Sequence, residues 1–287
     1  MIGIDEQEFR QLADFIHANY GINLGNEKKQ LLLGRLQGVL VKKNIGSFTE
    51  YYQQIMADKS GSEVATLLDR ITTNHTFFLR ENQHFEYLRS QVLPYLSATV
   101  RDKDLRIWSA GCASGQEAYT IAMLLADAFD GTPGWNKVIL ATDIASRVLE
   151  KAVSGIYQNN ELTGLPPAWE KKYFEKRNES ERTVRRSIQS EIIFRKFNLM
   201  EPVFPFKKKF HVIFCRNVMI YFDHQTKREL IGKFFNFTEP GGYLFVGHSE
   251  SLHRGESGYD YIAPGIYRKP GGGGYCDPKK DKSFNCR

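Results

Sequence analysis

Hydrophobic residues recur at helical spacing through the first quarter of the chain. In residues 6–18, Phe9, Leu12, Phe15 and Ile16 fall on one face of an amphipathic helix. The same spacing predicts further helices over residues 27–43, 47–56 and 62–72. These four segments predict a small all-α N-terminal domain, residues 1–75, without a visible catalytic centre.

From residue 105 onward, short apolar runs alternate with helical patterns, which is typical of a parallel, doubly wound sheet. Strands are expected over residues 105–108, 137–142, 211–215, 243–246 and 265–269. Helices are expected over residues 82–96, 116–129, 146–154 and 223–237. The pattern therefore predicts an α/β domain of the Rossmann-like class over residues 76–270.

One region interrupts this alternation, between residues 156 and 197. Its apolar positions are Val184, Ile188 and the run 192–194, which suits short antiparallel strands. We predict a small β insertion on the main sheet here. After the last predicted strand comes a run of glycines, so residues 271–287 are expected to form a flexible tail.

The composition is that of a globular protein, with 41% hydrophobic and 25% charged residues among 287. No apolar run is long enough to span a bilayer, and the N-terminus lacks a secretory signal, which predicts a cytoplasmic protein. Cys276 and Cys286 lack the spacing of a zinc site, and no metal is expected. The net charge of +6 favours an acidic partner, either nucleic acid or an acidic protein surface.

A turn of small residues, 109–115, joins the first predicted strand to its helix. Gly111 and Gly115 can adopt positive φ and allow a ligand to approach the backbone closely. Such a turn is where α/β proteins bind nucleotides. A P-loop would require Lys after the second Gly, but Gln116 and Glu117 follow here. A carboxylate at position 117 would also repel the pyrophosphate of a dinucleotide.

A positively charged cofactor without phosphate reverses this argument. S-adenosylmethionine (SAM) carries a sulfonium and an ammonium group, so the carboxylate of Glu117 becomes favourable. Asp143, at the end of the second strand, is placed to accept hydrogen bonds from ribose hydroxyls, and Arg80 could bind the methionyl carboxylate. Each signal alone has a structural explanation, since a strand-end Asp is often a helix cap. Together they favour SAM.

Several longer segments carry a family resemblance. They are TTNHTFFLRE at 72–81, WSAGCASGQEAYTIAM at 108–123, ATDIA at 141–145, FCRNVMIYFD at 214–223 and GGYLFVGHSES at 241–251. With them the chain resembles the chemotaxis receptor methyltransferases of the CheR type over about residues 5–269. The resemblance implies methyl transfer from SAM to glutamate side chains of chemoreceptors (methyl-accepting chemotaxis proteins). The products would be glutamate 5-O-methyl esters and S-adenosylhomocysteine.

The resemblance also implies where the cofactor binds. The positions implied are Asn74, Thr76, Arg80, Glu117, Asp143, Asn198, Leu199, Arg216 and Asn217. Gly111 is added to them because its turn lets a ligand approach the backbone. Asn198 and Leu199 would flank the adenine. Arg80 and Tyr221 are the catalytic candidates, although ordinary core packing is the alternative role for Tyr221.

The implied reaction needs little acid–base catalysis, because a glutamate substrate is ionised near neutral pH and the sulfonium is an activated methyl donor. We therefore expect catalysis by positioning and desolvation. Two other functions stay open. One is a regulatory module of the same fold that senses SAM without turnover. The other is a nucleic-acid methyltransferase, which the charge allows but which the lack of an aromatic stacking platform or an NPPY-type motif disfavours.

Basic residues recur at seven-residue spacing in the second predicted helix. Lys28, Arg35 and Lys42 would form one stripe on its surface. Because receptor methylation regions are acidic helices, the stripe predicts a docking surface, with an ordinary solvated face as the alternative. The expected partners are thus the cytoplasmic methylation helices of chemoreceptors, with no nucleic acid and no membrane insertion. The sequence does not determine the oligomeric state, and our expectation is a monomer.

One departure from the family concerns the β insertion. Some relatives carry a Gly-containing loop there that captures a receptor's C-terminal pentapeptide by strand addition. Residues 175–197 contain no Gly, and the stretch RNESERTVRR is charged and polar. We therefore predict that this protein does not need a tethering pentapeptide.

Overall fold

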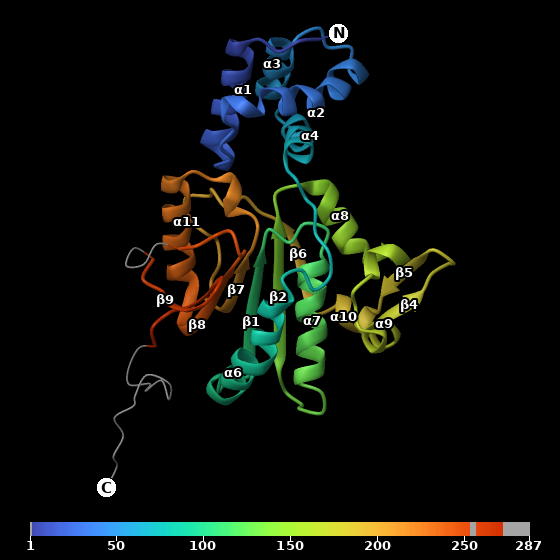
Figure 1. The fold of residues 1–287 in the computed structure, drawn as a ribbon, viewed down its shortest axis with the longest axis vertical. Helices are drawn as coiled ribbons and strands as arrows, with labels where there is room; N and C mark the ends of the chain where they lie inside the picture. Colours follow the sequence, from blue (N-terminus) through green and yellow to red (C-terminus); the bar gives the residue numbers. More distant parts are fainter. Residues whose placement is uncertain (1, 253–256, 272–287) are drawn as a thin grey trace.

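The computed structural model describes residues 2–252 and 257–271, so most of the predicted tail lies outside the described residues. A group of helices stands over one edge of a larger α/β part, and a small β subdomain projects from its side (Figure 1). No helix in the described ranges combines the length and hydrophobicity needed to cross a membrane.

The N-terminal part is helical, as predicted. It comprises α1 (Glu6–Tyr20), η1 (Asn26–Lys28), α2 (Lys29–Lys42), α3 (Phe48–Ala57) and α4 (Ser62–Ile71). Asp5 and Glu8 form a capping box at the start of α1, and Gly21 ends it in the left-handed conformation. The second predicted helix is divided, because residues 26–28 form a 3₁₀ turn before α2 begins.

The α/β part is built on a seven-stranded sheet. Its strands, in spatial order, are β6 (Ile192–Lys196), β2 (Asn136–Asp143), β1 (Asp104–Ala110), β7 (Phe210–Cys215), β8 (Thr238–Val246), β10 (Ile266–Arg268) and β9 (Asp260–Ala263). The first five run parallel, and the predicted strands among them are confirmed. The last predicted strand, β10, pairs antiparallel with β8 and with β9, so the sheet is mixed.

Helices cover both faces of this sheet (Figure 1). They are α5 (Asn82–Tyr87), a π-helical turn η2 (Leu88–Val92), α6 (Leu93–Thr99), α7 (Gln116–Ala128), α8 (Ser146–Ser154) and α11 (His224–Phe237). Trp108 of β1 is fully buried on the side where α11 packs. The apolar cluster on that side runs without interruption into the core of the N-terminal helices. The two parts therefore share one continuous hydrophobic cluster.

The predicted β insertion is present but smaller than expected. Its sheet consists of β3 (Ile156–Gln158), β5 (Glu181–Val184) and β4 (Phe174–Lys176), all antiparallel, with η3 (Asn159–Leu162), α9 (Pro167–Tyr173) and α10 (Arg186–Gln189) between and after them. The assignment of residues 192–194 to this insertion was wrong. They belong to β6, which pairs in parallel with β2 at the edge of the main sheet.

Candidate active site

The Gly turn after β1 lies at the carboxyl end of the parallel strands. Gly111 and Gly115 have φ of 99° and 93°, which favours glycine. At Gly111 a Cβ atom would lie 2.3 Å from the Val218 side chain, so this position requires the absence of a side chain. The turn is held to the next strand, because Ala113 N–H donates to the Asp143 carboxylate at 2.9 Å.

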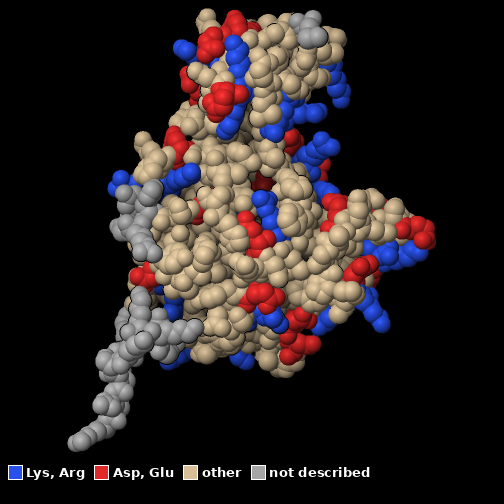
Figure 2. Space-filling view, in the orientation of Figure 1, with Lys and Arg blue, Asp and Glu red and all other residues tan. Residues whose placement is uncertain are grey.

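A cavity of about 340 Å³ opens above this turn, between the N-terminal helices and the strand ends. Figure 2 shows acidic and basic atoms together where the two parts of the molecule meet. The predicted site residues that line the cavity are Asn74, Thr76, Arg80, Gly111, Glu117, Asp143, Asn198, Leu199, Arg216, Asn217 and Tyr221. The structure thus brings every predicted cofactor and catalytic position to one cavity.

A buried ion pair lies in the wall of this cavity. The Arg216 side chain is only 2% exposed, and its Nε lies 3.6 Å from Oε2 of Glu117. Its guanidinium also donates to the Arg80 carbonyl and lies over the Phe85 ring. Nε and Nη1 of Arg216 nevertheless have no hydrogen-bond acceptor among the described residues. Buried donors of this kind are normally satisfied, so they are suited to the acceptor oxygens of a ligand.

Glu117 is held at the first turn of α7. Ser109 donates to its Oε1 at 2.6 Å. Burial raises the pKa of Glu117, while Arg216 and the Ser109 hydrogen bond act in the opposite direction. A carboxylate desolvated in this way gains more from a cationic ligand than one in water does.

Asp143 combines a structural role with exposure to the cavity. Its carboxylate accepts from the backbone N–H of Ala113 and of Ala145, at 2.9 and 3.0 Å. Burial raises the pKa of Asp143, and these hydrogen bonds oppose the shift. Asp143 does not cap α8, because the N–H that it binds belongs to Ala145, the N-cap residue of α8, and that helix has no side-chain cap. Each carboxylate oxygen can accept a further hydrogen bond from a ligand.

The hinge, residues 72–81, forms one side of the cavity. Arg80 folds back on this segment, with Nη1 donating to the His75 carbonyl at 2.8 Å. Leu79 and Glu81 both have positive φ, 57° and 54°, which turns the chain sharply on either side of Arg80. On the opposite side, Asn198 donates to the Asn19 carbonyl at 2.8 Å and so ties the cavity to α1.

Two carboxylates that support the cavity wall without lining the cavity were not predicted from sequence. Glu250 is 6% exposed and accepts from the backbone N–H of Asn217, Gly247 and Ile220, at 2.7, 2.7 and 3.0 Å. It thereby shapes the segment after β7. Glu81 lies 3.5 Å from the Arg216 guanidinium. Glu250 could have been suspected from the sequence, because it is an acidic residue between two serines in the loop after a predicted strand.

The basic stripe differs from its prediction in one respect. Lys28 lies in the 3₁₀ turn before α2, and Lys42 is exposed. Arg35 points to the hinge, where its guanidinium donates to the Ile71 carbonyl and, at 2.8 Å, to the Thr73 hydroxyl. The guanidinium of Arg35, the central cation of the stripe, is thus held by hydrogen bonds to other residues of this protein.

A Gly turn after the first strand, a strand-end carboxylate and a buried carboxylate facing the same cavity suit a cationic, phosphate-free nucleoside, as a SAM-dependent methyltransferase binds. Comparison with known families agrees. Residues 74–264 match "CheR methyltransferase, SAM binding domain", and residues 7–72 match "CheR methyltransferase, all-alpha domain".

Curated relatives extend this match along most of the chain. The chemotaxis protein methyltransferase of Borreliella burgdorferi is 40% identical over 272 residues, covering 93% of this chain and 96% of that protein. That of Escherichia coli is 34% identical over 269 residues, covering 93% and 92%. The chain belongs to the CheR family of chemotaxis protein methyltransferases. It is a SAM-dependent enzyme of the protein-glutamate O-methyltransferase class.

Proposed function

We propose that the protein transfers the methyl group of SAM to glutamate side chains in the cytoplasmic methylation helices of chemoreceptors. The products are glutamate 5-O-methyl esters and S-adenosylhomocysteine. The observation that carries this proposal is the single cavity that collects the predicted cofactor residues around the buried Arg216–Glu117 pair. The protein would act as a cytoplasmic monomer on the receptors' cytoplasmic segments.

The chain's own residues would bind and orient the two reactants. Bound SAM supplies an activated methyl group on a sulfonium. Glu117 would face its cationic methionyl end, and Asp143 would accept from the ribose hydroxyls. Leu199 would form an apolar wall beside the adenine, with Asn198 supplying a polar contact.

The substrate carboxylate would enter at the end of the cavity lined by Arg216, Asn217 and Tyr221. The free donors of Arg216 would bind one carboxylate oxygen and so aim the other at the methyl group. Arg80 stands at the same end, held by the His75 carbonyl, and would bind either the methionyl carboxylate or the substrate. No enzyme side chain needs to act as nucleophile.

The alternative is a module that senses SAM without turnover. The two functions differ in whether S-adenosylhomocysteine forms. We expect the protein to release it, and to transfer tritium from methyl-labelled SAM, with receptor membranes but not with RNA. Saturable SAM binding without product would support the sensing module, and label in RNA would support a nucleic-acid enzyme.

Residues 1–75 would serve as the receptor-docking domain, with α2 as its contact surface. Leu31 and Val41 on α2 are 47% and 61% exposed. An added Cβ at Gly34 or Gly38 would meet no atom within 4 Å, so a partner helix can approach the backbone closely. Lys28 and Lys42 would supply the complementary charge for an acidic helix, with Arg35 adding to the positive field from its position against the hinge.

Lys42→Glu should raise the apparent KM for receptor about threefold to tenfold and leave the SAM affinity unchanged. The effect should shrink as salt is added. Lys59→Glu, at an exposed lysine outside α2, is the matched control. Arg35→Glu is a less specific probe, because Arg35 also holds the hinge and its loss should weaken SAM binding as well. An unchanged KM in the Lys42 variant would remove α2 as the docking surface.

We also propose that no tethering pentapeptide is needed. The β4–β5 hairpin closes on itself, since Asn178 Oδ1 accepts from the N–H groups of Ser180 and Glu181 at 2.9 and 2.8 Å. The hairpin and the residues after it, 175–197, contain no glycine that would make the turn more flexible. Receptors with and without a C-terminal pentapeptide should be methylated at rates within about twofold. Nanomolar or low-micromolar peptide binding in calorimetry would contradict this proposal.

A further inference from the structure

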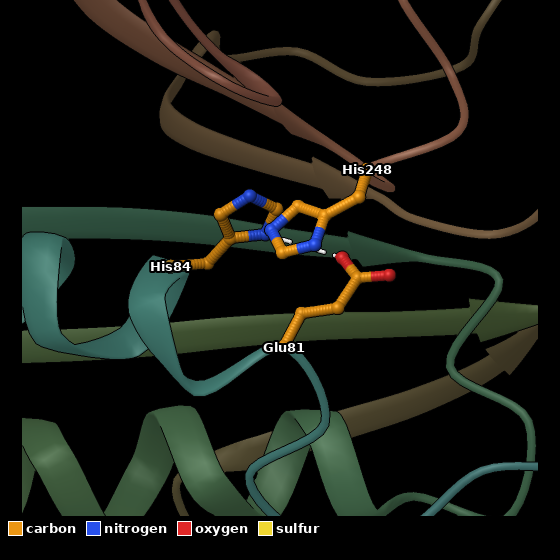
Figure 3. A group of neighbouring side chains, drawn as sticks. All are labelled: Glu81, His84 and His248. Atoms are coloured by element: carbon orange, nitrogen blue, oxygen red, sulfur yellow. Dashed lines mark ion pairs between the residues drawn. The ribbon is translucent and has the colours of Figure 1, made fainter.

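A carboxylate and two imidazoles meet behind the cavity wall, at Glu81, His84 and His248. One ligand atom of each lies within 4.8 Å of the others. Glu81 and His84 come from the start of α5, and His248 follows β8. Figure 3 shows the three side chains turned toward one another. The proposed methyl transfer uses Glu81 only through its contact with Arg216, and it assigns no role to the two histidines.

The tautomer of His84 decides what the cluster can bind. Its ring is 1% exposed, and Nε2 lies 3.1 Å from the Pro264 carbonyl. A carbonyl can only accept, so Nε2 carries the proton and donates it. Nδ1 then carries an unprotonated lone pair, and it faces Oε2 of Glu81 at 3.5 Å. Both atoms are buried and lack a hydrogen-bond partner among the described residues.

The geometry leaves two acceptor atoms opposed. With Nε2 of His84 donating to Pro264, Nδ1 of His84 and Oε2 of Glu81 face each other at 3.5 Å, and neither has a hydrogen-bond donor among the described residues. A small cation would satisfy both.

We propose that Glu81, His84 and His248 form a binding site for a divalent transition-metal ion of the Zn²⁺ type. Two imidazoles and one carboxylate are a usual ligand set for Zn²⁺, with water as a fourth ligand. A tetrahedral site with metal–ligand bonds of about 2.0–2.2 Å places its ligand atoms about 3.3–3.5 Å apart. The His84–Glu81 separation fits this spacing, and the exposed His248 is free to close the third side.

The surroundings of His84 match a metal ligand. Metal-bound histidines usually donate their second N–H to a carbonyl, as His84 does to Pro264. Gly265, with φ of 71°, lets the backbone pass close to the ring, because a Cβ there would lie 2.7 Å from His84 Nε2. Arg216 lies 3.5 Å from Glu81 and 3.6 Å from Glu117, so a bound metal ion would share the Glu81 carboxylate with this guanidinium. A metal ion would join the hinge to the β8 loop, two residues from Glu250.

The test uses the full chain, treated with chelator and then titrated with Zn²⁺ in a calorimeter. Cys276→Ser and Cys286→Ser are included so that tail thiols cannot bind the metal. We expect one Zn²⁺ per chain, a raised Tm on addition of Zn²⁺, and the visible absorption of tetrahedral Co²⁺ when that ion replaces it. Nε2 protonation of His84 should persist in the Zn²⁺ form by NMR.

A variant at the exposed ligand avoids disturbing the core. His248→Ala should weaken the Zn²⁺ affinity at least tenfold and remove the Tm increase at a Zn²⁺ concentration that just saturates the wild type. Glu81→Gln should also weaken Zn²⁺ binding, but it alters the contact with Arg216 as well. His17→Ala, which removes an exposed histidine of the N-terminal part, should leave the affinity unchanged. Absence of saturable Zn²⁺ binding, or binding that His248→Ala does not alter, would overturn the proposal.

Discussion

Arg216→Lys is expected to lower kcat/KM about 100-fold, because lysine keeps the charge but cannot reproduce the planar set of donors. In this site the guanidinium reaches Glu117, Glu81 and the Arg80 carbonyl at once, and still has two donors without an acceptor. Those free donors are what we expect the substrate carboxylate to bind. Steady-state rates with a receptor fragment and labelled SAM measure the effect.

Arg216→Ala should be more severe, since it leaves two buried carboxylates without a counterion and also lowers the Tm. Arg89→Lys is the matched control, because Arg89 is exposed and pairs only with Glu86 among the described residues. A kcat/KM within threefold of wild type for Arg216→Lys would show that the guanidinium does not position the reacting groups.

Glu117→Gln is expected to weaken SAM binding about 10- to 100-fold, the worth of a hydrogen bond to a charged partner in a buried site. The amide keeps the size of the side chain and removes its charge. S-adenosylhomocysteine lacks the sulfonium but keeps the ammonium of the methionyl end. An equal loss for both ligands therefore assigns the contact of Glu117 to the ammonium, and a smaller loss for S-adenosylhomocysteine assigns it to the sulfonium. Calorimetric titration of both ligands gives the comparison, with Glu150→Gln on the exposed face of α8 as control. Unchanged affinity for both ligands would contradict the charge argument.

The same carboxylate predicts a pH dependence. Burial raises the pKa of Glu117, so protonation begins at a higher pH than for an exposed glutamate. The protonated form has no charge to offer a cation. SAM affinity should therefore fall as the pH is lowered toward that raised pKa, whereas Glu117→Gln should respond less. A parallel pH profile for both proteins would assign the titration to another group.

Much of the site could be predicted because its residues lie at the ends of short apolar segments that the sequence itself marks as strands. The turn at Gly111 and the strand ends at Asp143 and Arg216 follow from short apolar runs and their boundaries. The carboxyl ends of parallel strands meet at one edge, so residues far apart in sequence could be expected together. Family resemblance added most of the hinge, because composition alone allowed either a polar connector or a loop that covers a ligand with Arg80.

What could not be predicted depends on pairing between distant segments. The apolar run at 192–194 has the same pattern whether its strand pairs parallel or antiparallel, and only packing against β2 assigns it to the main sheet. Strand β9 was not predicted for the same reason, because its place in the sheet depends on its antiparallel pairing with β10.

The contacts of Arg35 and Glu81 were equally hidden. Arg35 reaches Thr73 only because α4 returns the chain toward α2, and no spacing in the second helix indicates it. Glu81 meets His248 across 167 residues of chain. The positive φ of Glu81 and Asn217 is favoured by no local glycine.

The central claim is that this cavity esterifies receptor glutamates. The most direct measurement is transfer of the labelled methyl group from SAM to a receptor fragment that carries the methylation helices, compared with the same fragment in which the methylated glutamates are replaced by glutamine. We predict label in the first fragment only, released as methanol by mild alkali as expected of a carboxyl ester. Alkali-stable label, equal label in the glutamine fragment, or SAM binding without any transfer would contradict the account.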